Sequence, residues 1–118
     1  MQTVAITSAA NDRYRRWKKI MESPRAARKT GFTLAEGAHL AGVILERDFP
    51  VESILLRDGG VSAEAMGYAQ AIAKRGSVRT FVVAPALYDA VSPVEHGSGL
   101  TLEIPVPAFS GIGTPPEI

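Results

Sequence analysis

Basic side chains are concentrated at the start of the sequence, where their chemistry suits contact with phosphates. Residues 1–29 hold eight basic residues and only two acids, Asp12 and Glu22, which gives this segment a net charge of +6. Residues 30–118 hold five basic residues and ten acids, a net charge of −5. Phosphate neutralisation supplies much of the affinity for nucleic acids, so this polarity predicts a polyanionic partner.

The basic residues fall into a helix and the segment that follows it. Five of them lie within seven positions of a helix predicted over residues 11–22, where they repel one another at i, i+3 and i, i+4. This crowding favours RNA contact over a merely solvated face, because arginine forks onto phosphate or stacks on unpaired bases. The candidate contacts are Arg13, Arg15, Arg16, Lys18, Lys19, Arg25, Arg28 and Lys29.

The same helix has one apolar stripe. Tyr14, Trp17 and Met21 recur at helical spacing with Ile20 beside them. The two aromatic rings could stack on bases, but their place on the stripe favours core packing. Asn11 either caps this helix or contacts RNA, and capping is slightly favoured. Replacing Arg13, Arg16 and Lys19 with glutamate is expected to abolish RNA binding without unfolding the chain.

Glu36 and His39 also invite a chemical interpretation, yet they predict no catalytic or metal site. One carboxylate at a strand end, without a second acid or a nucleophile, is not a catalytic set. One glutamate and one histidine supply too few ligands for a stable metal site. We expect Glu36 to accept backbone hydrogen bonds beside Gly37, the alternative being that it shapes an RNA-binding face. Cysteine chemistry is excluded, because the chain has no cysteine.

Hydrophobic periodicity predicts a layered α/β domain with about four strands in a mostly parallel sheet. A basic connector or a second short helix is expected at 25–31. The predicted strands are 32–36, 51–56, 78–83 and 100–104, and the predicted helices are 11–22, 38–48, 62–75 and 84–91.

The end of the sequence changes composition. Residues 105–118 hold four of the eight prolines together with Gly111 and Gly113. We therefore expect residues 1–107 to form one domain and residues 108–118 to form a linker to a further part of a longer protein. Apolar runs are too short for a membrane helix and no secretory signal is evident, so a cytoplasmic protein without a membrane partner is expected.

A family resemblance rests on the order of several short motifs. Ser8-Ala9-Ala10-Asn11 precedes the basic helix, the Arg25–Lys29 segment follows it, and Phe32 to Gly37 reads as a strand ending in Glu-Gly. This order resembles the N-terminal substrate-binding domain of SpoU-type (TrmH-like) RNA 2′-O-ribose methyltransferases. The likeness extends over about residues 5–107.

The resemblance implies a three-layer α/β/α fold like that of ribosomal kink-turn-binding proteins, with RNA as the partner. It adds Asn11, Glu36 and His39 to the candidate RNA contacts. It also implies that residues 108–118 link to a C-terminal catalytic domain that this chain lacks. S-adenosylmethionine is implied as the cofactor of that missing domain, which would also form a homodimer, and no cofactor is expected in residues 1–107. Alone, the chain should bind RNA without catalysing methyl transfer, and family prevalence favours rRNA over tRNA.

Two other classes of function remain open at this stage. A free-standing structural RNA-binding protein of ribosomal type would use the same basic segment. A small α/β enzyme or nucleotide-binding domain is less favoured, because Gly59-Gly60 and Gly97-Ser98-Gly99 do not match the glycine-rich phosphate loops.

Overall fold

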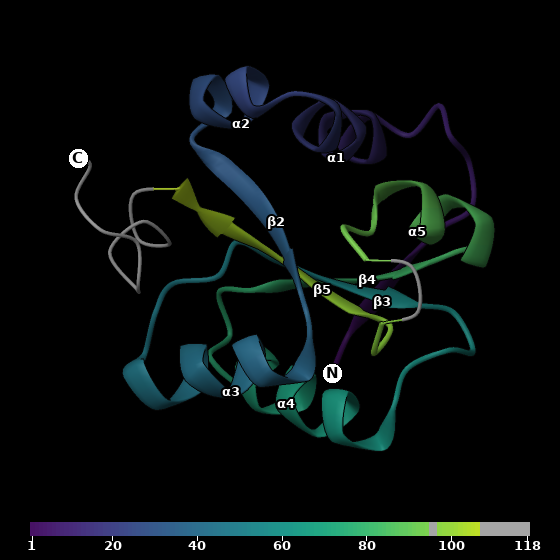
Figure 1. The fold of residues 1–118 in the computed structure, drawn as a ribbon. Coiled ribbons are helices and arrows are strands. Elements are labelled where there is room, and N and C mark those ends of the chain that lie inside the picture. The colour runs from purple at the N-terminus through teal and green to yellow at the C-terminus, as the bar shows by residue number, and fades with distance from the viewer. Residues whose placement is uncertain (95–96, 107–118) are drawn as a thin grey trace.

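The computed structural model describes residues 1–94 and 97–106, in which strands and helices alternate along most of the chain (Figure 1). The linker predicted at 108–118 lies outside the described residues. The strands are β1 (Thr3–Ile6), β2 (Phe32–Glu36), β3 (Ser53–Arg57), β4 (Arg79–Val83) and β5 (Leu100–Pro105). The helices are α1 (Asp12–Glu22), α2 (Pro24–Thr30), α3 (Ala38–Arg47), α4 (Ala63–Ala73) and α5 (Pro85–Val91).

The strands form one mixed sheet in the order β1-β4-β3-β5-β2. β4 runs parallel to both β1 and β3, whereas β5 runs antiparallel to both β3 and β2. The sheet therefore has one more strand than the sequence predicts and is less parallel. At seven residues, α5 is about 10 Å long, too short to return the chain along the length of β4, so β5 runs back antiparallel.

Helices cover both faces of the sheet, which confirms the three-layer α/β/α architecture. Figure 1 shows α1, α2 and α5 on one face and α3 and α4 on the other. Beneath α1 and α5, the core includes Trp17, Leu55 and Phe81. On the opposite face, Ile44 of α3 and Ile72 of α4 pack against the sheet. The basic residues of the N-terminal segment belong to α1 and α2, so they lie on the first of these two faces.

The boundary between α1 and α2 follows directly from local sequence. Ser23 is the single residue between the helices, and its hydroxyl accepts a hydrogen bond from the backbone N–H of Ala26. Pro24 occupies the first turn of α2, where a missing N–H costs nothing. Gly31 ends α2 with φ +84°, a conformation that glycine adopts without strain. The segment that could be a connector or a helix is thus a helix.

A buried tyrosine joins α5 to the middle of the sheet. The hydroxyls of Tyr88 and Thr101 lie 2.7 Å apart and share a hydrogen bond. Burial raises the pKa of Tyr88 to about 12, and the hydrogen bond to Thr101 opposes part of that rise. Tyr14 of α1 also has a raised pKa because of burial, which Lys18 partly offsets. Both phenols are therefore held in the neutral form.

We predict that stability falls as the pH rises from about 10 to 12. The unfolded chain loses the Tyr88 proton near 10 and the folded chain keeps it to about 12, so the contribution is complete below 10 and is lost across this window. Denaturant unfolding should show Tyr88→Phe to be less stable than wild type at neutral pH, yet with a shallower decline above pH 10. Parallel declines in the two proteins would contradict this assignment.

Candidate nucleic-acid interface

Asn11 fixes the start of the basic helix. Its side-chain Oδ1 accepts hydrogen bonds from the backbone N–H groups of Arg13, at 2.9 Å, and Tyr14, at 3.1 Å. These are two of the N–H donors that have no partner within the first turn of a helix. The capping role favoured from the sequence is confirmed. An RNA contact by this exposed residue stays a prediction.

The aromatic residues of α1 belong to the core. Tyr14 is 2% exposed and its hydroxyl donates to the carbonyl of Leu87 at 2.9 Å. Trp17 is fully buried and meets Phe81 edge to face, with ring centroids 5.2 Å apart. Core packing is thus confirmed over base stacking, because neither ring has a face open to a ligand.

A buried carboxylate on β5 anchors the helix. Glu103 has no solvent-exposed surface, and its Oε1 accepts a hydrogen bond from the indole N–H of Trp17 at 3.2 Å. The Nη2 of Arg16 lies 2.8 Å from Oε2 of the same carboxylate as an ion pair. A buried charge is tolerated when it is paired in this way. Arg16 is therefore held internally by the fold.

Arg13 and Arg16 also use their flat guanidinium groups within the protein. Arg16 lies over the ring of Phe32, 4.7 Å from its centroid, and Arg13 lies over Phe81 at 5.3 Å. The triple glutamate replacement of residues 13, 16 and 19 is therefore not a clean test of RNA binding. The glutamate at position 16 would place a second carboxylate beside Glu103 and disturb the packing of α1 against the sheet.

The cations that stay accessible lie on the outer side of α1 and α2, and we call them the basic ridge. The two helices pack against each other on the same face of the sheet (Figure 1). Arg15, Lys19 and Thr30 line a hollow of about 390 Å³ between the helices, together with Arg16 and with Asp12, the one acid of its lining. Lys18 is half-buried and pairs with Glu22 at 3.5 Å, so we leave it out. The basic ridge consists of Arg15, Lys19, Arg25, Arg28 and Lys29, all exposed.

Arg28 and Lys29 also have a structural role, because they lie in the last turn of α2. Cations at a helix C-terminus interact favourably with the helix dipole, by about 0.3–1 kcal/mol. No ion pair to any of the five ridge residues occurs within residues 1–94 and 97–106. Dipole compensation needs only one or two cations, so the ridge keeps an excess of positive charge for an external anion.

Glu36 and His39 lie apart from the ridge. Glu36 ends β2 at the end remote from α2, and its Oε2 accepts hydrogen bonds from the backbone N–H of Ser98 at 2.5 Å and from its hydroxyl at 3.0 Å. Gly37 follows with φ +127°, a backbone conformation that glycine adopts more readily than other residues. His39 is exposed on α3, which covers the opposite face of the sheet (Figure 1). The structure thus separates the predicted site residues into two surfaces.

The hollow next to α5 and the acidic and histidine side chains of the described residues supply no catalytic or metal site. A hollow of about 580 Å³ next to α5 is lined by Arg57 and Asp89 among others. The guanidinium of Arg57 donates two hydrogen bonds to the carboxylate of Asp89, at 2.9 and 3.1 Å. Within the described residues, no three histidine or acidic side chains gather as metal ligands would. No helix there is long and apolar enough to cross a bilayer.

Solved structures with a similar fold are RNA-modifying enzymes. The chain superposes on an RNA 2′-O ribose methyltransferase with a TM-score of 0.75 and 21% identity, over 98% of this chain and 40% of the other. An rRNA methyltransferase from Sinorhizobium meliloti gives a TM-score of 0.68 at 14% identity, over 87% of this chain and 37% of the other.

A third structure is the SpoU methyltransferase AviRb from Streptomyces viridochromogenes, determined with its cofactor AdoMet. It gives a TM-score of 0.67 at 15% identity, over 80% of this chain and 35% of that one. This chain has the fold of one part of these methyltransferases. It spans about two fifths of their length, and at such identities the likeness establishes the fold alone. No protein-family model and no curated protein matches the sequence.

The ion pair beneath α1 generates a stability prediction. Arg16→Ala should cost about 3–5 kcal/mol, because it leaves the carboxylate of Glu103 buried without a cation. Glu103→Gln should cost less, because the side chain of Arg16 is 34% exposed and its charge can reach water. Arg15→Ala, the exposed neighbour, is the control and should change stability by less than about 0.5 kcal/mol.

The double variant Arg16→Ala/Glu103→Gln should cost less than the sum of the two single changes, because the second removes the charge that the first leaves unpaired. Urea unfolding of the four variants measures these differences. Additive costs would show that the two side chains do not depend on each other.

Proposed function

We propose that this chain is the N-terminal RNA-recognition domain of an S-adenosylmethionine-dependent RNA 2′-O-ribose methyltransferase, with rRNA as its target. The observation that carries the proposal is the basic ridge, an unpaired set of five exposed cations on two adjacent helices. The fold shared with RNA 2′-O-methyltransferases supports the same class of partner.

The ridge acts through the backbone of the RNA. Arginine and lysine side chains on the outer side of α1 and α2 contact phosphates, and this contact supplies affinity without reading sequence. Arg16 positions the helix through Glu103 and takes no part in phosphate contact. The ridge is thereby preorganised, and less conformational entropy is lost when RNA binds.

Chemistry is assigned to a separate C-terminal domain, which also forms a homodimer. S-adenosylmethionine supplies the methyl group there when bound. The residues described in this chain hold the RNA and orient it. When a ribose hydroxyl is held in line with a methyl donor, its translational and rotational freedom is already lost on binding. The barrier of the chemical step is therefore lower by several kcal/mol.

Reversing charge on the ridge tests the proposal. Arg15→Glu/Lys19→Glu should weaken binding to an rRNA hairpin at least tenfold at about 0.15 M salt. The slope of log affinity against log salt concentration should fall by about 1.4–1.8, because each of the two lost phosphate contacts removes about 0.7–0.9. Filter binding over a series of salt concentrations measures both quantities.

The matched control is Arg47→Glu/Lys74→Glu. It makes the same change in net charge at exposed positions at the C-terminal ends of α3 and α4, on the opposite face of the sheet. It should keep the wild-type salt slope and most of the affinity. Equal losses in the two double variants, or binding by the wild type that ignores salt, would refute the proposed function.

A further inference from the structure

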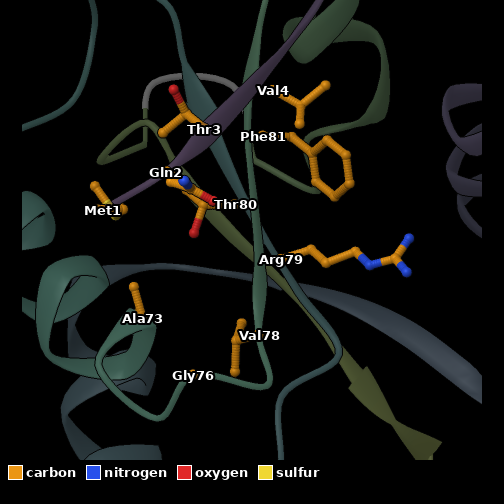
Figure 2. A pocket seen from close by; sticks show the side chains of 10 residues that line it. All are labelled: Met1, Gln2, Thr3, Val4, Ala73, Gly76, Val78, Arg79, Thr80 and Phe81. Atoms are coloured by element: carbon orange, nitrogen blue, oxygen red, sulfur yellow. The ribbon is translucent and has the colours of Figure 1, made fainter.

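A hollow of about 890 Å³ lies beside the edge strand β1 of the sheet that α1 and α2 cover. Figure 2 shows that its lining comes from β1, from β4 and from Ala73 and Gly76 at the end of α4, and that the side chains of Val4, Phe81 and Arg79 are directed to one side of the sheet. The register agrees, because Val4 pairs with Phe81 and Arg79 lies two residues before Phe81 on β4. Val4 is 57% exposed, so this side of the hollow is open and partly apolar.

Arg79 is a cation whose side chain has no partner in the protein. It is exposed, and within residues 1–94 and 97–106 its side chain makes no ion pair or hydrogen bond. The ladder between β1 and β4 begins at Thr80, so Arg79 lies just beyond the strand that covers β4, where a cation also deters pairing with another chain. Pairing within the described residues therefore does not account for Arg79.

A second cation lies over the same face of the sheet. The guanidinium of Arg13 lies over Phe81, two residues along β4 from Arg79, and the Cα atoms of Arg79 and Phe81 are about 7 Å apart. One nitrogen of Arg13, Nη1, is buried without a hydrogen-bond partner. Arg13 and Arg79 thus share the face of the sheet on which Phe81 lies.

One acid on this face is already engaged. In the strand register, Arg79 lies beside Ser53 and Ser53 lies beside Glu103, and these three share the face under α1. Glu103 pairs with Arg16, and within the described residues no ion pair reaches Arg13 or Arg79. An external anion would supply the partner that both side chains lack.

We propose that Arg13 and Arg79 form a second phosphate-binding point, which takes the backbone of a single-stranded RNA segment running from the basic ridge toward β1. Val4 offers an apolar contact to an unstacked base at the same hollow. Tracking a strand with spaced cations and apolar contacts is how proteins bind unpaired RNA. This inference rests on the proposed function and adds the form of RNA and the path that it takes.

The test compares an RNA hairpin with the same hairpin extended by about six unpaired uridines on either end. Wild-type protein should bind one of the extended RNAs about tenfold more tightly, as expected for one further charged contact. Arg79→Gln should remove this gain and leave binding of the plain hairpin unchanged. Arg47→Gln, an exposed arginine on the other face, is the control and should keep the gain.

Each other outcome overturns the inference. If Arg79→Gln and Arg47→Gln both keep the gain, the second point does not exist, although the proposed function stands. If Arg79→Gln weakens binding of the plain hairpin as much as binding of the extended one, Arg79 contributes only to the general electrostatic attraction for RNA and forms no separate binding point. If the wild type binds none of the RNAs, the proposed function fails with the inference. Arg79→Lys, which keeps the charge and removes the fork, should restore part of the gain.

Discussion

The ion pair between Glu103 and Arg16 is the interaction on which the arrangement of this protein depends. A carboxylate without exposed surface is costly to bury, and the cost is offset only if a cation and a hydrogen-bond donor reach it from α1. Arg16 and Trp17 are adjacent in sequence and both reach the same group. The rotation of α1 about its axis is therefore fixed, and that rotation decides which cations face outward.

With α1 fixed in this way, one helix serves two purposes. Its inner side supplies Tyr14, Trp17 and Ile20 to the core, and its outer side presents Arg15 and Lys19. The single-residue connection at Ser23 places α2 directly beside α1, so the cations of both helices extend one surface. The cations on that surface repel one another, so they do not hold it together. The packing of the core beneath the two helices preorganises the surface instead.

Local features were predictable from the sequence because they depend on neighbours in the chain. The cap at Asn11, the apolar stripe at Tyr14 and Trp17, and the order of strands and helices after residue 30 are of this kind. β1 was missed because it is short and exposed: only Ile6 of its four residues is buried, so the strand has no readable alternation. The antiparallel direction of β5 was not predictable in this way, because it depends on how far α5 carries the chain back along the sheet.

The roles of Glu103 and Arg79 could not be predicted for a different reason. Alternation in Leu100 to Ile104 shows that Thr101 and Glu103 share a face, but it does not show that α1 covers that face. Likewise, Arg79 reads as one polar residue at the start of a strand until α1 places Arg13 over Phe81, two residues along β4. Both residues acquire their meaning from contacts between segments more than 60 positions apart in the chain.

The last described strand is tied to α1 and α2 at two points. Glu103 of β5 holds α1 through Arg16, and the backbone N–H of Val106 donates to the carbonyl of Gly31, at the end of α2, at 2.9 Å. Both helices are therefore joined to the chain within a few residues at the end of β5. A shift of either helix against the sheet must displace the end of this strand or break one of the two contacts.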